Sequence, residues 1–224
     1  MRKTWILAAV LVAGSAGAQG LKTEDEKAIY TLGYLMGKNV RNDFSPSAAE
    51  LEAFKKGVAD AQKDSAPALK IDEYQPKLQA LAQARGKIRA DKEREKGKAF
   101  LEKAAMDKGA QKLPSGVIYT ELKAGTGANP AASDTVSVHY KGTLTNGEEF
   151  DSSYKRGQPT SFPLNGVIPC WTEGVQKMKV GGKAKLVCPS DKAYGDRGAP
   201  PKIPGGATLV FEVELVEIKK DPKK

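Results

Sequence analysis

Histidine and cysteine are scarce in this chain of 224 residues, which contains one histidine, His139, and two cysteines, Cys170 and Cys188. One histidine leaves no constellation of ligands for zinc. Two cysteines are too few for a disulfide scaffold, although they allow a single bridge. These absences argue against a zinc enzyme and against a small fold held together by many disulfides.

Long apolar runs are also absent after the first residues, so no later segment is expected to cross a bilayer. Residues 1–18 begin with the basic Arg2 and Lys3, continue with an apolar stretch over residues 5–13, and end on small residues. This pattern predicts a cleaved secretory signal peptide, with an anchoring helix as the alternative, and no cysteine at the cleavage site offers a lipid anchor. We therefore expect an exported chain, with the bacterial periplasm as the favoured compartment.

Acidic residues are outnumbered, with 27 aspartates and glutamates against 36 lysines and arginines, for a formal net charge of +9. A basic balance is compatible with nucleic acid, but an exported protein rarely meets any. Positively and negatively charged side chains are mixed along the chain, except in a basic tail at residues 219–224. The charges therefore indicate a solvated surface with at most weak affinity for anionic membranes or polymers, and no nucleic-acid partner is expected.

The first hundred residues show the period of helices and contain no catalytic constellation. Capping-box pairs, Thr23 with Glu26 and Ser47 with Glu50, predict where two short helices begin. Their apolar residues recur on one face of each helix: Ile29, Leu32, Gly33, Met36 and Val40 in the first, and Leu51, Phe54, Val58 and Ala61 in the second. We expect residues 19–70 to form a helical dimerisation module, and the alternative is that these helices fold back on the next one.

A long connecting helix is expected over residues 71–111, because no strong breaker occurs before Gly109. Residues 89–98 in its middle are almost wholly charged, interrupted only by Ala90 and Gly97. A helix that is polar all round usually bridges two bodies through solvent. The charged stretch therefore predicts a solvent-exposed spacer.

The composition changes at residue 112, after which alternating strands take over. Val136, Val138 and Tyr140 share one face of a predicted strand, and Asn146 with Gly147 is a strong hairpin signal. Further strands are predicted over residues 117–122, 183–188 and 209–215, and a short helix over residues 171–178. Residues 112–218 therefore indicate an α+β domain in which an antiparallel twisted sheet wraps on a short helix.

This second half resembles the FKBP-type peptidyl-prolyl cis-trans isomerases in the order and spacing of its motifs. They are V-x-V-H-Y-x-G-x-L, F-D-S-S, V-I-x-x-W, A-Y-G and A-T-L-V-F-x-V-E-L, spread over residues 112–217. The helical first half is similar in architecture to the macrophage infectivity potentiator and its periplasmic relatives, which are dimers through that half. The resemblance implies an isomerase that uses no cofactor and no covalent intermediate, and it implies a homodimer.

The resemblance also implies an apolar pocket beneath the sheet. Trp171 would form its floor, Asp151 would be the polar group at its rim, and the backbone amide of Ile168 would donate to a bound peptide. The walls would be Tyr140, Phe150, Phe162, Val167, Ile168, Tyr194, Ile203 and Phe211. The implied ligands are proline-containing unfolded or partly folded polypeptides, with rapamycin- or tacrolimus-type macrolides as inhibitors.

Four positions depart from the usual pattern of the family. Thr160 stands where an aromatic residue is common, Cys170 where glycine is, Ala199 where histidine is frequent, and Lys202 where an apolar flap residue is usual. These departures bear on peptide preference and drug affinity more than on activity.

Each singled-out residue also has a plainer explanation. The aromatic residues of the strands would serve as ordinary core, and Asp151 would be a turn residue. Strand alternation places His139 on the opposite face from Tyr140, so we interpret it as structural. Cys170 and Cys188 are either bridged or two buried thiols, because geometry decides and the sequence does not show it.

The sequence thus predicts an exported prolyl isomerase that accelerates the folding of other exported proteins, with chaperone activity in the cleft between two catalytic domains. One alternative is a non-catalytic holdase that binds hydrophobic segments. Another is a surface interaction protein that acts on host targets.

Overall fold

The computed structural model describes residues 20–63 and 66–219. The chain divides into two compact units, Met1–Ala68 and Leu69–Lys224. The predicted signal peptide, and all of the basic tail after Lys219, lie outside the described residues. Within the described residues no helix has the length and apolar character needed to span a membrane.

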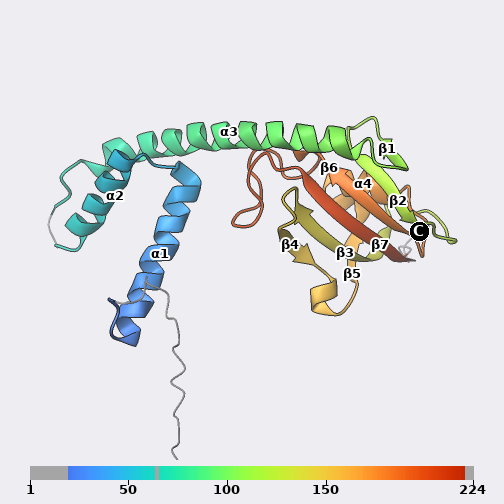
Figure 1. Ribbon diagram of the computed structural model, residues 1–224, viewed down its shortest axis with the longest axis horizontal. Helices are drawn as coiled ribbons and strands as arrows, with labels where there is room; N and C mark the ends of the chain where they lie inside the picture. Colours follow the sequence, from blue (N-terminus) through green and yellow to red (C-terminus); the bar gives the residue numbers. More distant parts are fainter. Residues whose placement is uncertain (1–19, 64–65, 220–224) are drawn as a thin grey trace, which may run out of the picture. The chain divides into compact units, whose positions relative to one another are not determined.

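The first unit contains helices α1 (Glu24–Phe44) and α2 (Ala48–Ala61) (Figure 1). Both predicted capping boxes are confirmed, since the side chains of Thr23 and Ser47 accept from the third helical amide and that glutamate bonds back to the cap. No residue of either helix is buried. Their large apolar side chains are exposed: Ile29, Tyr30, Leu32, Tyr34, Leu35, Met36, Leu51 and Val58.

The second unit begins with α3 (Ile71–Ala104), a helix of 34 residues that is about 51 Å long. It ends at Ala104 rather than at residue 111, and the turns that follow, with Gly109 at a positive φ of 80°, lead the chain into a strand. That strand, β1 (Ala110–Lys112), pairs with β2, so the sheet starts before the expected boundary at residue 112.

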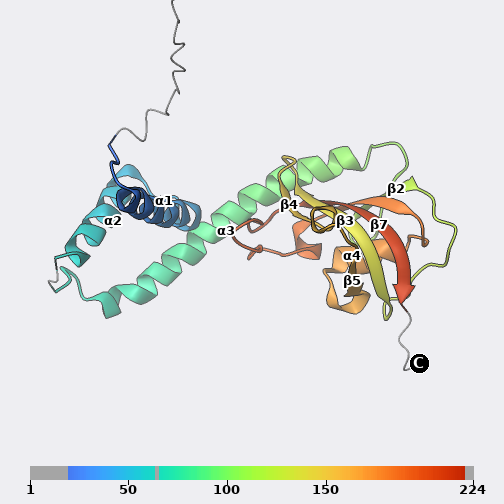
Figure 2. The same ribbon diagram turned by 90° about the horizontal axis from the view of Figure 1, so that it is seen from below.

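Seven strands form one antiparallel sheet in the order β1-β2-β6-β7-β3-β4, with β5 paired to β3 (Figures 1 and 2). The remaining strands are β2 (Ile118–Lys123), β3 (Thr135–Leu144), β4 (Glu149–Ser152), β5 (Thr160–Pro163), β6 (Lys183–Cys188) and β7 (Leu209–Lys219). One short helix, α4 (Pro169–Val175), packs against the sheet, and short 3₁₀ turns, η1 (Tyr154–Arg156), η2 (Leu164–Gly166) and η3 (Ser190–Lys192), complete the unit. The predicted α+β fold, a sheet wrapped on a short helix, is confirmed.

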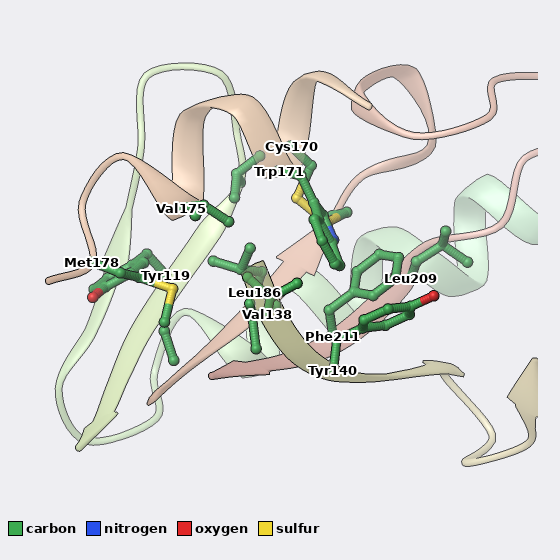
Figure 3. Close-up of a cluster of buried hydrophobic side chains, with 14 of the residues drawn as sticks. Tyr119, Val138, Tyr140, Cys170, Trp171, Val175, Met178, Leu186, Leu209 and Phe211 are labelled. Atoms are coloured by element: carbon green, nitrogen blue, oxygen red, sulfur yellow. A yellow bond between two sulfur atoms is a disulfide. The ribbon is translucent and has the colours of Figure 1, made fainter. Parts of the chain in front are cut away.

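The main core lies between α4 and the sheet (Figure 3). Strand alternation works as predicted, because successive side chains point to opposite faces. The buried inward residues are Val136, Val138 and Tyr140 of β3, Ala184, Leu186 and Cys188 of β6, and Leu209, Phe211, Val213 and Leu215 of β7. A smaller cluster of Ala104, Ile118 and Val187 joins the end of α3 to β2 and β6.

The expectation that residues 89–98 of α3 cross solvent is wrong. Ala90 has an exposed fraction of 0%, and Gly97 is also buried. A Cβ placed on Gly97 would lie 2.1 Å from Oγ1 of Thr208, just before β7. The two small residues are seven positions apart, so they share one helix face. That face packs against residues near β7, while most of the charged residues of this stretch are exposed on the other sides of the helix.

Candidate active site

Four aromatic rings from four different elements meet at one end of the main core. Trp171 of α4 is 4% exposed, and three rings meet it edge-on. The ring-centroid distances to Trp171 are 5.2 Å from Tyr140 of β3, 5.6 Å from Phe162 of β5 and 5.3 Å from Phe211 of β7. Figure 3 shows Trp171 standing between α4 and the rings of Tyr140 and Phe211. Perpendicular contacts of this kind add to the free energy of burial and hold the rings in fixed orientations.

We call the four rings of Tyr140, Phe162, Trp171 and Phe211 the aromatic cage. A glycine in β3 makes room for it. Gly142 is the cross-strand partner of both Asp151 and Phe211. A Cβ at this position would lie 2.6 Å from the Phe150 ring and 2.9 Å from the Phe211 ring, and those two rings are themselves 5.5 Å apart. The motif position held by glycine therefore lets two aromatic side chains approach over the backbone of β3.

The other predicted wall residues divide into three groups. Ile203 is buried in the same core cluster as Trp171, and Val167 and Ile168 pack partly buried against it. Tyr194 is 42% exposed and lies outside that cluster. The structure thus brings together every predicted aromatic residue except Tyr194.

Ile168 stands at the start of α4 and is the helix N-cap. Its carbonyl accepts hydrogen bonds from the amides of Trp171 (2.9 Å) and Thr172 (3.2 Å). Its own N–H donates no hydrogen bond to another described residue. Exposed amides at a helix start are open to an acceptor on a ligand.

The polar rim is a three-residue network around Asp151 of β4. The carboxylate accepts hydrogen bonds from the Tyr140 hydroxyl and from Nη1 of Arg156 (2.6 Å), while Nη2 of Arg156 donates to the Tyr140 hydroxyl (2.8 Å). Burial acts to raise the pKa of Asp151, but the hydrogen bonds from Tyr140 and Arg156 outweigh it and hold that pKa below its usual value. Burial and the hydrogen bond to Asp151 raise the pKa of Tyr140.

Arg156 was missed by the sequence reasoning. It belongs to the 3₁₀ turn η1, and the only signal was a basic residue five positions after Asp151. The departure at Thr160 is explained by the same residue, because the Thr160 hydroxyl accepts from Nη2 of Arg156 (3.3 Å). A larger aromatic side chain at position 160 would not supply that acceptor.

His139 lies away from the cage, as the alternation of β3 predicts. Its ring stacks on Tyr154 with centroids 4.8 Å apart, and Nδ1 lies 3.2 Å from the Ser153 hydroxyl. Among the described residues no group of three or more His, Cys, Asp or Glu side chains is placed to hold a metal ion. A cavity of about 310 Å³ beside the end of α3 is lined by none of the predicted site residues.

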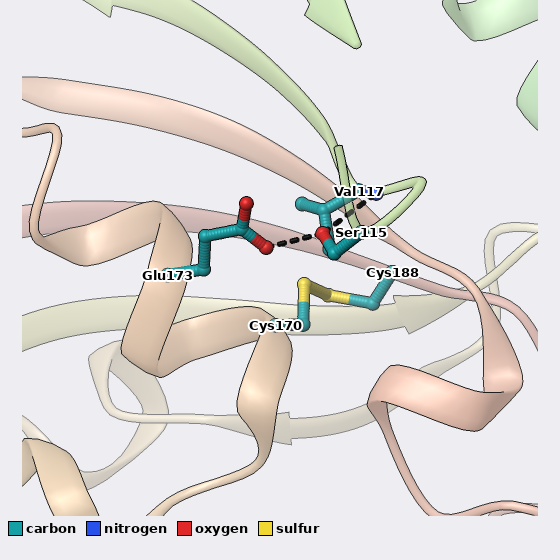
Figure 4. Close-up of a disulfide and its surroundings, with 5 residues drawn as sticks. All are labelled: Ser115, Val117, Cys170, Glu173 and Cys188. Atoms are coloured by element: carbon teal, nitrogen blue, oxygen red, sulfur yellow. Dashed lines mark hydrogen bonds between the residues drawn. A yellow bond between two sulfur atoms is a disulfide. The ribbon is translucent and has the colours of Figure 1, made fainter. Parts of the chain in front are cut away.

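Cys170 and Cys188 form a disulfide, with their Cα atoms 5.7 Å apart. The bridge joins α4, at the residue before Trp171, to the end of β6 (Figure 4). Both cysteines are fully buried. Nearby, the Ser115 hydroxyl donates to the Glu173 carboxylate, which ties the same helix to the turn before β2. The departure from glycine at position 170 thus gives a covalent link beneath the aromatic cage.

The lowered pKa of Asp151 predicts a flat pH profile. The carboxylate stays ionised above its ordinary pKa of about 3.9, so the favourable network is intact there and is lost only as the pH falls through the lower folded-state pKa. The isomerisation rate that the resemblance leads us to expect, corrected for the uncatalysed reaction, should therefore not change between about pH 5 and 8. An Asp151→Asn variant should show a lower plateau over the same range. A bell-shaped wild-type profile centred near neutrality would contradict this prediction.

A twisted antiparallel sheet wrapped on one short helix, with four aromatic rings packed between them beside a polar network, is the arrangement that the structure offers as a candidate site. The comparisons with known proteins identify the family to which this fold belongs. Residues 127–216 match the FKBP-type peptidyl-prolyl cis-trans isomerase domain, and residues 25–120 match the domain amino terminal to it. The chain belongs to the family of FKBP-type peptidyl-prolyl cis-trans isomerases, and that is its enzymatic class.

Two relatives and one solved structure illustrate the likeness. The isomerase FkpA of Escherichia coli strain K12 is 42% identical over 214 residues, which are 90% of this chain and 78% of that protein. The outer membrane protein MIP of Legionella longbeachae is 36% identical over 213 residues, 91% of this chain and 89% of that one. The crystal structure of Escherichia coli FkpA superposes with a TM-score of 0.67 at 40% identity and covers 91% of this chain and 100% of that one.

Proposed function

We propose that the aromatic cage around Trp171 binds the proline ring of a peptide and catalyses rotation of the preceding imide bond. One observation carries the assignment. The indole Nε1 of Trp171 is buried and has no hydrogen-bond partner among the described residues. An unmet buried donor costs free energy, and native structures seldom keep one without a reason. A carbonyl of a bound peptide would supply the missing acceptor.

The chemistry needs no nucleophile. Rotation about an X–Pro bond crosses a barrier of about 18–20 kcal/mol because it breaks amide resonance. A site that fits the twisted imide better than either planar form lowers that barrier. The twisted imide has less charge separation than the planar forms. An apolar cage therefore raises the free energy of the twisted imide less than it raises that of the polar planar forms.

Fixed polar groups would orient the peptide in this cage. The Tyr140–Asp151–Arg156 network holds the rim in one arrangement, and the Ile168 amide is free to donate to a backbone carbonyl of the peptide. Groups that are already in place when the substrate binds reduce the entropy lost on the way to the transition state.

The expected setting is an oxidising compartment outside the cytoplasm, where the chain assists the folding of exported proteins. The pattern of residues 1–18 and the disulfide both support export, since disulfides persist in oxidising compartments. One relative is named an outer membrane protein, which supports an envelope location.

We also propose that the helical module predicted over residues 19–70, which contains α1 and α2, serves dimerisation. Apolar faces on α1 and α2 are exposed within the described chain, with Ile29 at 68% and Tyr34 at 62%. Monomeric soluble proteins rarely expose contiguous apolar patches, and a second copy would cover these faces. Sedimentation of the full chain should give a dimer, and replacing Ile29 and Leu32 with glutamate should shift it to a monomer.

Catalysis is tested by exchange spectroscopy on a proline tetrapeptide, with and without rapamycin. Wild-type protein should accelerate exchange, and rapamycin should inhibit it. Asp151→Ala should lower kcat/KM about tenfold, because a charge-assisted hydrogen bond is lost from the rim. Absence of exchange above background from folded wild-type protein would contradict the assignment of the cage.

A holdase remains a second candidate because the exposed apolar faces of α1 and α2 also suit unfolded chains. Light scattering of an aggregating client separates the two functions. If the helices hold clients, Asp151→Ala should protect as well as wild type while its isomerisation falls. A parallel loss of both activities would place client binding in the cage.

A further inference from the structure

Residues 193–208, between η3 and β7, form a loop that we call the flap. It carries Tyr194, which is 42% exposed, and Ile203, which is buried with Trp171 in the core cluster. At its tip Lys202 donates from Nζ to the carbonyl of Phe150 (2.8 Å). The departure at position 202 thus ties the flap to the strand that carries Asp151.

The flap is held together mainly by its own backbone. Ala199 and Ile203 exchange hydrogen bonds of 2.9 and 3.0 Å, Gly198 donates to Tyr194 (3.1 Å), and Gly206 donates to Gly195 (2.9 Å). Such a loop has few buried apolar side chains, and loops of this kind open more readily than strands. An outside support would therefore change how well it holds Ile203 in the pocket.

Helix α3 supports the flap through several contacts, and the first of them is between the two backbones. Gly206 lies so close to α3 that a Cβ there would be 2.1 Å from the carbonyl oxygen of Ala90. Gly206 also has a positive φ of 78°, so both sterics and backbone conformation require glycine. The neighbouring Gly205 would place a Cβ 3.6 Å from the Cβ of Ala90.

Two further contacts follow along the same helix face. Arg94 hydrogen-bonds Asp196 of the flap and also Asp91 of its own helix. Gly97 packs on Thr208, with room for no side chain between them. Ala90, Arg94 and Gly97 are spaced at i, i+4 and i+7, which is one face of a helix.

We propose that α3 is part of the isomerase site, and that its face of Ala90, Arg94 and Gly97 positions the flap over the proline pocket. The inference rests on the proposed function of the cage. It assigns Arg94 as a positioning residue that acts through Asp196 and touches no substrate.

The consequence is a link between α3 and substrate binding. A shift of α3 away from the flap removes the support of Gly206 and Thr208, and Ile203 and Lys202 lie on the same short loop. A loosened flap is expected to raise KM more than it lowers kcat, because the cage of Trp171 is built on other elements.

The test compares two glycines of α3 in the full chain. Gly97→Ala adds a methyl group against Thr208, whereas Gly86→Ala adds the same group where the nearest atom is Nη2 of Arg89, at 3.8 Å. Both changes favour the helix equally. Amide hydrogen exchange at Gly198, Ile203 and Gly206 should rise about tenfold in Gly97→Ala alone, with a rise in KM. The amide of Val213 in β7 should not change.

A second pair of variants covers the case in which Gly97→Ala fails to fold. Arg94→Met removes the bond to Asp196, and Lys92→Met removes a charge from an exposed position of the same helix. Flap exchange should rise about two- to fivefold in Arg94→Met only, and Arg94→Lys should recover part of the loss. Equal exchange and equal KM in each matched pair would overturn the inference.

Failure of the proposed function would look different. Wild-type protein without isomerase activity would contradict the function of the cage, while the exchange difference between Gly97→Ala and Gly86→Ala would still report whether α3 holds the flap. Normal wild-type activity with no such difference would contradict only the role of α3.

Discussion

Replacing Cys170 and Cys188 together with alanine is expected to lower the free energy of unfolding of residues 69–224 by about 3 kcal/mol. The bridge closes a loop with a sequence separation of 18, and a closed loop of this length restricts the unfolded chain. A loss of this size corresponds to a fall in melting temperature of about 6 to 12 °C for a unit of this length. Urea unfolding followed by tryptophan fluorescence measures it.

Reduction provides the matched control for this prediction. A thiol reductant should lower the unfolding free energy of wild-type protein by a similar amount and leave the double alanine variant unchanged. Since the bridge joins the residue before Trp171 to the end of β6, the packing of Trp171 in the proposed site should loosen with it. A difference below 1 kcal/mol between wild type and the double variant would mean that the native structure is strained by the bridge or that the unfolded chain is already compact.

The sheet could be predicted from the sequence because one of its faces is buried against α4. In such a sheet apolar and polar residues alternate, and β3, β6 and β7 all show that alternation. The strands β1 and β5 were not predicted, since they have only three and four residues and few apolar side chains. Their positions depend on pairing partners far along the chain, which local patterns do not encode.

The packing of α3 could not be predicted by counting charges. Residues 89–98 are mostly charged, and the average character of that stretch indicated solvent. The packing was indicated by the small residues among the charged ones, because Ala90, Gly97 and Ala104 recur every seven residues and all three are buried. Small residues at that spacing let a backbone approach closely, so a partner surface was encoded without any apolar stripe.

The polar network around Asp151 could also be predicted only in part from the sequence. Asp151 was expected at the rim, but Arg156 and the acceptor role of Thr160 depend on how η1 folds back toward β4. Hydrogen-bond partners four to sixteen positions apart in a turn region follow no fixed period. The cage residues were available through the resemblance, whereas the network that orders the rim required coordinates.

The floor of the cage is expected to be the most sensitive position of the chain. Trp171→Ala should lower the unfolding free energy by about 3 to 5 kcal/mol, because it removes a large buried side chain and three ring contacts at once. It should also lower kcat/KM by about a hundredfold or more, since it removes the ring that the other three rings of the proposed site contact. Trp171→Phe should fall between wild type and Trp171→Ala, because it keeps an apolar ring and loses the indole N–H.

Met178→Ala separates stability from catalysis in this test. Met178 is 1% exposed in the same core cluster but packs beside Tyr119, away from the cage (Figure 3). Its loss should cost about 2 to 5 kcal/mol, comparable to the loss at Trp171. Assayed where both variants are folded, Met178→Ala should keep nearly full activity. Equal loss of activity in the two variants would show that catalysis depends on the stability of the whole core, and the cage would then lose its special role.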